Sequence, residues 1–562
     1  MTVPAAAADH TTSIPAVATV LGGQPCWIHG TGAARAVLLC GAQGHEGLAS
    51  HHAWHVLADM LAGAGLMAVR FDYPGEGDAL DLADDADPIS AAIDAIGRVY
   101  DAVAAMPGVA SVSVTGLRLG GLLAQRALVG RPIQRLALLA PVDSGRAYIR
   151  ALTAQARLST GGGETDGSTL VVNGFRLPAA GATTLAGLAL DPSAPDCPIL
   201  LAGGAERAVI TGALRIGFDD YEAMLAPTEM TPPLITFRTV TKWLAQDAAP
   251  AMSVERTFPP AVLALDHGRE ERLRFGPDLR LAGIYCRPSA PAAGRPCVLF
   301  TNAGTNPHAG WARMSVDHAR AMAVEGVASL RFDLSGLGDS AVAWQSPRRS
   351  VYSPAHPDDL TAAIDLAKAS GAETIVVAGL CSAGHLALHG AAQDRRINAV
   401  LAANVLKFLW TADDDLDRYE AQALQSAAQY GARVGSGQAW RRVLSGEVSP
   451  ARVLRVAGML AGRVLRQRLD KIGVSFHLGA ESRQVRALVR AVTARGCAVT
   501  LLNSVGDASI DEAERQFGSN FSGIRGWPGV SVASLGPSDH ELSAKKARDL
   551  FYEAIKRRAL GI

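Results

Sequence analysis

Short apolar runs alternate with longer segments of mixed polarity along most of the chain. Residues 37–41 and 298–302 are apolar runs that enter a loop, and each is followed by a segment of helical character and a second apolar run, at residues 65–71 and 326–332. Near-continuous apolar runs are typical of parallel strands that are buried on both faces beneath helices. The pattern therefore predicts an α/β fold built on mostly parallel sheets.

The pattern occurs twice. The triplet Arg-Phe-Asp begins at Arg70 and again at Arg331, 261 residues later, and both copies are followed by a Gly-x-Gly-Asp turn. A glycine at the end of a later apolar run, Gly116, has its counterpart at Gly379, 263 residues later. A near-constant spacing and a shared order of runs predict a tandem duplication.

The join between the two copies is expected near residues 245–258, where proline and alanine interrupt the pattern. We therefore expect a first domain at residues 1–250 and a second at residues 256–562, called the first half and the second half below. Residues 272–285 alternate around a Gly-Pro-Asp turn and predict the antiparallel hairpin that opens the second sheet.

Composition narrows the class of protein. The 53 basic and 53 acidic residues cancel, which gives no reason to expect a nucleic-acid partner. No uncharged apolar run has membrane-spanning length, and residues 1–15 lack the features of a signal peptide, so neither is expected. The seven cysteines are odd in number and contain no CxxC pair, which argues against a disulfide framework or a zinc site and fits a reducing cytoplasm.

Residues 376–385 carry the clearest chemical signal. A β-branched run ends at Gly379, Cys381 follows two residues later, and small residues come next. This is the pattern of a nucleophile elbow, the sharp strand-to-helix turn that presents an attacking side chain. With Cys381 as nucleophile, the positions two before and two after it are Gly379 and Ala383, which are both small. With Ser382 as nucleophile, a leucine would crowd the turn, so the spacing favours Cys381; a buried cysteine in an ordinary turn is the alternative.

The matching turn of the first half, at residues 114–121, keeps the backbone spacing but places Arg118 where the second half has Cys381. A guanidinium stays protonated and cannot attack a carbonyl. A general base is missing as well, because no histidine occurs between Val56 and Asp266. We therefore predict a catalytically silent first half, kept for packing or for binding an anion through Arg118.

Four histidines of the first half, His45, His51, His52 and His55, lie close together in the sequence. His51 and His55 have the i, i+4 spacing of metal ligands on a helix. No carboxylate in the pattern of a zinc protease accompanies them. We therefore predict no metal ion for this cluster.

The residues that a cysteine nucleophile needs follow it in the order acid, then base. An apolar run at residues 498–503 leads to Asp507, which is the better candidate for the acid; Asp511, four residues on, is the alternative. The last apolar run, at residues 530–535, leads to His540 just before a closing helix, where a general base is expected.

These residue types suit acyl chemistry. The thiolate of Cys381 is the attacking form, and His540 would take the thiol proton. Asp507 would hold the imidazole in the correct tautomer. The oxyanion is expected to bind the backbone N–H of Ser382 and one from the loop at residues 303–305, that of Thr305 or Gly304.

A long insertion at about residues 407–470 is expected to form a helical cap over the pocket, matched in the first half at about residues 144–192. Between residues 433 and 468 it carries eight arginines against the single Glu447. This charge indicates either a solvated helix face or a surface that receives an anionic group, such as a phosphopantetheine arm, a CoA phosphate or an acidic glycan.

The motifs at residues 331–339, the turn at residues 379–384 and the terminal Asp539-His540 resemble the α/β-hydrolase superfamily, in its serine-aminopeptidase-like branch. The two elbows are also similar to those of hydrolases found beside bacterial exopolysaccharide and exosortase systems. The superfamily resemblance implies two tandem α/β-hydrolase domains with esterase, thioesterase, lipase, amidase or acyltransferase activity and no cofactor. Cysteine in place of serine departs from the usual pattern of the superfamily. Dienelactone hydrolases and some aminoacyl shuttles share this cysteine, and the resemblance to them adds acyl transfer through a thioester to the expected activities.

Three functions remain open from these residues. The first is a hydrolase that acts on an ester or thioester through Cys381, His540 and Asp507 and a covalent acyl-enzyme. The second is an acyltransferase that moves an acyl group from a CoA or carrier-protein thioester, and the third is a non-catalytic binding protein. The expected partner is a small-molecule or carrier-bound acyl substrate, and the sequence does not determine the oligomeric state.

Overall fold

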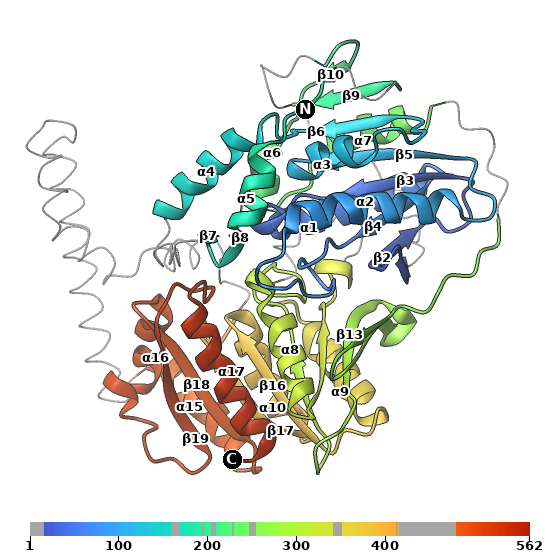
Figure 1. Cartoon of the computed structure of the whole chain (residues 1–562). Coiled ribbons are helices and arrows are strands. Elements are labelled where there is room, and N and C mark those ends of the chain that lie inside the picture. Colours follow the sequence, from blue (N-terminus) through green and yellow to red (C-terminus); the bar gives the residue numbers. More distant parts are fainter. Residues whose placement is uncertain are drawn as a thin grey trace, which may run out of the picture.

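The computed structural model describes residues 16–158, 169–192, 196–203, 210–226, 230–246, 254–340, 351–411, 414 and 479–562. It contains two large sheets, one in each half, that lie beside each other (Figure 1). Most of the predicted cap at residues 407–470 lies outside the described residues.

The sheet of the first half has eight strands in the order β1-β2-β4-β3-β5-β6-β9-β10. Among the described strands of this sheet, only the pairs β1–β2 and β2–β4 are antiparallel. The strands are β1 (Val17–Leu21), β2 (Gln24–His29), β3 (Arg35–Cys40), β4 (Met67–Phe71), β5 (Ser111–Leu117), β6 (Leu136–Leu139), β9 (Ile199–Ala202) and β10 (Leu214–Ile216).

The sheet of the second half has nine strands in the order β11-β12-β13-β15-β14-β16-β17-β18-β19. The strands are β11 (Val262–Leu265), β12 (Gly268–Phe275), β13 (Leu281–Pro288), β14 (Pro296–Phe300), β15 (Ala328–Phe332), β16 (Thr374–Leu380), β17 (Ile397–Ala403), β18 (Ala498–Val505) and β19 (Val530–Pro537). The hairpin predicted at residues 272–285 is present, because β12 and β13 pair antiparallel with Phe275 opposite Leu281.

The two sheets have the same strand order once the extra edge strand β11 is set aside. In each of them one strand pairs antiparallel with the strand that bears Arg-Phe-Asp, which in turn pairs parallel with the strand before it in the chain. The predicted pair of mostly parallel α/β folds is confirmed. That the two halves arose by duplication stays a prediction.

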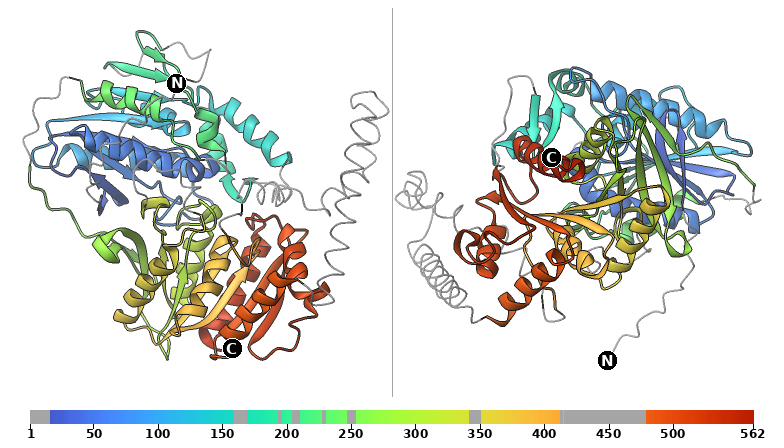
Figure 2. Two further views of the ribbon diagram at one scale, coloured as in Figure 1. Left: turned by 180° about the vertical axis from the view of Figure 1, so that it is seen from behind. Right: turned by 90° about the horizontal axis from the view of Figure 1, so that it is seen from below.

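Helices cover both faces of each sheet, as Figure 2 shows in two further views. The buried clusters place α1 and α7 on one face of the first sheet with α2 and α3 on the other, and α8 and α17 on one face of the second sheet with α9, α10 and α15 on the other. The helices are α1 (Gly44–Gly63), α2 (Pro88–Ala104), α3 (Leu119–Ala127), α7 (Leu234–Leu244), α8 (Met314–Val324), α9 (His356–Ala369), α10 (Ser382–Gln393), α15 (Ala480–Thr493) and α17 (Lys545–Leu560). None of the helices in the described residues is both long and apolar enough to cross a bilayer.

The insertion of the first half forms a small unit between β6 and β9. It consists of α4 (Gly145–Leu158), the two-stranded hairpin of β7 (Thr169–Val172) and β8 (Phe175–Pro178), and α5 (Ala179–Ala186). Figure 1 shows the tip of this hairpin reaching toward the second half, where the Trp311 indole N–H donates to the carbonyl of Asn173 at 2.7 Å. The described residues of this insertion therefore include the two helices α4 and α5 and, in addition, this hairpin.

Candidate active site

The turn between β16 and α10 has the geometry of a nucleophile elbow. Cys381 lies there with φ 56° and ψ −119°, a backbone conformation that few residues other than glycine adopt. The turn is tight at Gly379, where a Cβ atom would lie 2.3 Å from the carbonyl carbon of Ala383. The backbone strain therefore falls on Cys381, and not on Ser382, which is the first residue of α10.

The first half repeats this turn with a different side chain. Arg118 has φ 53° and ψ −123°, within a few degrees of the values at Cys381, so the two residues occupy the same place in the fold. The guanidinium of Arg118 lies 2.9 Å from Glu46 and donates to the carbonyl of Ala140 at 3.1 Å. The Glu46 carboxylate therefore neutralises the charge of Arg118 inside its own half. The same carboxylate also accepts a hydrogen bond from the Tyr148 hydroxyl at 2.9 Å.

The loops after β18 and β19 bring His540 and Asp507 together. His540 Nδ1 lies 3.2 Å and 3.1 Å from the two carboxylate oxygens of Asp507. Asp507 is almost fully buried, with 3% of its side chain exposed, and it also caps α16 (Ala508–Phe517) by accepting from the N–H of Ser509 at 2.9 Å. Asp511, the alternative acid, lies in the first turn of that helix, and it is Asp507 that faces the imidazole.

Cys381 lies next to the imidazole. Burial would lower the pKa of His540, but the electrostatic influence of Cys381 and Asp507 beside it holds that pKa well above its ordinary value. His540 Nε2 is buried and has no hydrogen bond of ordinary geometry among the described residues. The thiol and imidazole are thus close enough to interact electrostatically, in the loose arrangement common in catalytic pairs before substrate binds.

The loop after β14 approaches the elbow. The N–H of Gly304 donates to the Ser382 hydroxyl at 2.9 Å, which ties this loop to the first turn of α10. Of the two loop donors expected from the sequence, Gly304 is therefore the one seen bonded toward the elbow. The Thr305 hydroxyl points elsewhere and donates to Met230 Sδ at 2.9 Å. The N–H of Ser382 belongs to the first turn of α10, where N–H groups have no partner within the helix.

Several polar residues support this arrangement and were not singled out from the sequence. Asn404, which follows β17 with φ 44°, donates from Nδ2 to the carbonyl of His540 at 3.0 Å. Glu541 accepts from Asn306 Nδ2 at 3.3 Å, and burial raises the pKa of its carboxyl group to about 7. The loop itself is held by Asp333 of the Arg-Phe-Asp motif, whose repetition signalled its importance without revealing its contacts.

The histidine cluster of the first half lies beside a buried carboxylate. His55 lies 3.3 Å from Asp59, a carboxylate that the sequence pattern missed, and His29 Nδ1 lies 2.6 Å from the same group. Arg70 Nε donates to His29 Nε2 at 3.1 Å, so the ring proton of His29 is on Nδ1 and faces Asp59. Although these three side chains are close enough to share a metal ion, a guanidinium against one ring nitrogen and a proton on the other do not suit one.

Comparisons with known proteins add limited information. No protein-family profile matches the sequence, and no curated protein is significantly similar to it. Among solved structures, Est1E from Butyrivibrio proteoclasticus is 15% identical, with 41% of this chain and 98% of that chain covered and a TM-score of 0.29. The acylaminoacyl peptidase of Pyrococcus horikoshii is 15% identical, with 53% and 43% covered and a TM-score of 0.32. The proline iminopeptidase of Mycobacterium smegmatis is 14% identical, with 52% and 99% covered and a TM-score of 0.32.

Proposed function

We propose that this chain, with an α/β-hydrolase fold in each half, is an enzyme whose second half cleaves an ester or thioester through a covalent acyl-enzyme. The observation that carries the proposal is the strained cysteine at the elbow beside the His540–Asp507 pair. Nucleophile, base and acid are the three groups that this reaction requires, and the described part of the first half offers no such set around Arg118.

The reaction follows from the positions of these groups. His540 takes the thiol proton of Cys381, and the sulfur attacks the carbonyl carbon of the substrate. The resulting oxyanion accepts hydrogen bonds from the N–H of Ser382 and of Gly304, once the substrate displaces the Ser382 hydroxyl from Gly304. The alcohol or thiol leaves with the proton from His540, and water then attacks the thioester with His540 as base. An acyl acceptor in place of water gives the transferase.

Selective alkylation tests the nucleophile. Cys381 is partly exposed, whereas burial raises the pKa of Cys197 and Cys497 to about 11. The other four cysteines are buried, and burial raises the pKa of each of their thiols as well. Iodoacetamide near neutral pH should therefore label Cys381 first, and His540→Ala should slow that labelling. Peptide mass mapping measures both.

Activity and adduct formation complete the test. Incubation with activated esters, acyl-CoA and acylated carrier protein should give an acyl adduct on Cys381 by intact mass, and Cys381→Ala should abolish both the adduct and turnover. Full turnover in Cys381→Ala together with absent labelling would move the nucleophile to Ser382. As a control in the other half, Arg118→Ser should create no activity, because no histidine occurs between Val56 and Asp266, where a general base that follows the elbow would lie.

A further inference from the structure

The loop that carries the proposed oxyanion donor, residues 301–313, is contacted by the first half at several points, two of which, at Thr305 and His308, lie within four residues of Gly304. The Thr305 hydroxyl donates to Met230 Sδ at 2.9 Å, and His308 Nε2 lies 2.8 Å from Asp78 Oδ2. Met230 and Asp78 both belong to the first half. We infer that the silent first half positions the oxyanion loop of the second half through Asp78 and Met230, an inference that rests on the proposed function.

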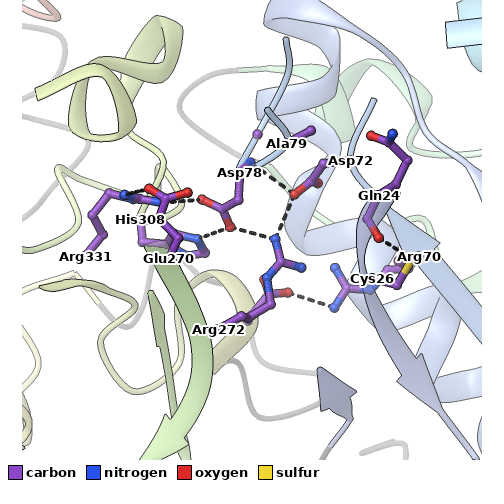
Figure 3. Close-up of polar contacts among 12 residues, drawn as sticks. Gln24, Cys26, Arg70, Asp72, Asp78, Ala79, Glu270, Arg272, His308 and Arg331 are labelled. Carbon is purple, nitrogen blue, oxygen red and sulfur yellow. Dashed lines mark hydrogen bonds and ion pairs between the residues drawn. The ribbon is translucent and has the colours of Figure 1, made fainter. Parts of the chain in front are cut away.

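Asp78 is a buried carboxylate at the boundary between the halves, where donors from the second half converge on it (Figure 3). Its Oδ2 atom accepts from Arg272 at 2.7 Å and faces His308, and its Oδ1 atom accepts from Arg331 at 3.1 Å. Burial would raise the pKa of Asp78, but His308 and the two arginines hold it well below its usual range. Asp78 is therefore an ionised carboxylate of the first half that is held in place by side chains of the second half.

His308 connects Asp78 to the backbone of the loop. Its Nδ1 atom lies 2.7 Å from Asp333 Oδ2, so both ring nitrogens face carboxylates, and the imidazolium form can donate to both. Asp333 Oδ1 accepts from the backbone N–H of His308 at 2.7 Å and from Asn302 Nδ2 at 2.6 Å. Asn302 Nδ2 also donates to the carbonyl of Asn306 at 2.8 Å. The path from Asp78 thus ends on backbone groups that flank residues 304–305.

The same ion pair occurs in the opposite direction. Arg70 of the first half lies 2.7 Å from Asp339 of the second, as Arg331 of the second lies 3.1 Å from Asp78 of the first. Both arginines come from Arg-Phe-Asp and both carboxylates from Gly-x-Gly-Asp, so the halves contact each other as the subunits of a two-fold dimer do.

The two ion pairs differ in the loop that follows the aligned strands β14 and β3, because only the loop after β14 has a polar side chain, that of Asn302, at the aligned position. The strand register pairs Cys40 with Gly116 and Phe300 with Ala378, which aligns Gly41 of the first half with Asn302 of the second. A glycine has no side chain to continue the path. The Arg70–Asp339 pair is a buried pair of the same chemistry, and Asp339 touches the path only through its backbone N–H, which donates to Asp333 Oδ2 at 2.9 Å. Because Arg70→Gln leaves that backbone bond in place, the pair provides a matched control.

The expected effect follows from the loop's task. Displacing an oxyanion donor by about 1 Å, or losing it, typically lowers the rate by about 10²–10³-fold. Asp78→Asn weakens one end of the path and leaves the catalytic groups in place, so we expect turnover of an activated ester to fall by about 10–100-fold. Alkylation of Cys381 by iodoacetamide forms no oxyanion, since the thiolate displaces iodide from a methylene carbon, and it should stay within about two-fold.

The experiment compares these two rates in the full chain for Asp78→Asn and Arg70→Gln, with thermal unfolding measured for both. The inference predicts that Asp78→Asn loses turnover and keeps alkylation, while Arg70→Gln keeps both within about three-fold. Equal turnover in the two variants would overturn it, and so would a parallel loss of alkylation and turnover in Asp78→Asn.

A second variant decides the matter if Asp78→Asn does not fold. Met230→Ala removes the contact with Thr305 without changing a charged group, and it should lower turnover with alkylation unchanged, whereas Met230→Leu should have the smaller effect. Unchanged turnover in Met230→Ala would then overturn the inference. Failure of the proposed function has a different signature, which is full turnover in Cys381→Ala.

Discussion

At the scale of single residues, two glycines make the elbows possible. The strained residues Cys381 and Arg118 each follow a glycine by two positions, Gly379 and Gly116, and a Cβ there would lie 2.3 Å and 2.5 Å from backbone atoms of the following helix. The same steric requirement therefore holds in both halves, although Cys381 occupies one elbow and Arg118 the other. Geometry at this position is needed for folding as well as for chemistry.

The matched substitutions Gly379→Ala and Gly116→Ala separate the two requirements. Both should lower the free energy of unfolding by about 2–4 kcal/mol, because a backbone clash cannot relax without moving the helix. Gly379→Ala should also abolish turnover, while Gly116→Ala should leave the rate per folded molecule unchanged. Denaturant unfolding and activity measured on the folded fraction test this. Equal losses of rate in both variants would contradict it.

At the scale of elements, the N-cap residue of α16 makes two contacts. Its N-cap Asp507 satisfies the N–H of Ser509 and is also the carboxylate that faces His540. Burial would raise the pKa of Asp507, yet His540 and the bonds from Ser509 lower it, so the group is ionised in the folded protein. Helix capping and the contact with the His540 imidazole therefore depend on one side chain.

Two substitutions at this cap distinguish its roles. Asp507→Asn keeps an oxygen for the Ser509 N–H but loses the charge beside His540, so turnover should fall by about 10²–10⁴-fold with stability changed by less than about 1 kcal/mol. Asp507→Ala should show a similar loss of rate and an additional loss of about 1 kcal/mol in the free energy of unfolding. An equal stability of the two variants would show that the cap contributes nothing.

At the scale of the whole molecule, the halves are joined by buried charge. Asp78 of the first half is surrounded by His308, Arg272 and Arg331 of the second half. In the opposite direction, Arg70 of the first half forms an ion pair with Asp339 of the second half. Burial would lower the pKa of His308, but Asp333 and Asp78 raise it well above its ordinary value. The contact between halves therefore depends on a histidine that stays protonated.

This histidine gives the stability a dependence on pH. A histidine whose pKa is raised in the folded state contributes its full stabilisation at pH values below its unfolded-state pKa of about 6.5. This contribution is lost as the pH rises through the folded-state pKa. The wild-type free energy of unfolding should therefore fall relative to that of His308→Gln as the pH is raised from 6 to 10. Urea unfolding at each pH measures the difference, in which other titrating groups cancel. A constant difference across this range would contradict the assignment of a charged His308.

The sequence by itself determined the features that depend on neighbours along the chain. Apolar periodicity predicted the α/β architecture, and the repeated motifs predicted the shared strand order, because strand and turn formation follow local sterics and burial. The same local reasoning indicated Cys381 in place of Ser382 and ordered Asp507 and His540 after it. The hairpin β7–β8 in the insertion of the first half was not predicted.

Only the tertiary structure decided the contacts between residues hundreds of positions apart. Neither motif reveals that Asp78 faces His308, 230 residues later, or that Met230 lies against Thr305. Such contacts depend on how two folded halves pack, and no short-range pattern encodes the packing of two surfaces that are formed only after each sheet is complete. The physical reason is that side-chain chemistry sets which groups can pair, whereas the fold sets which of them meet.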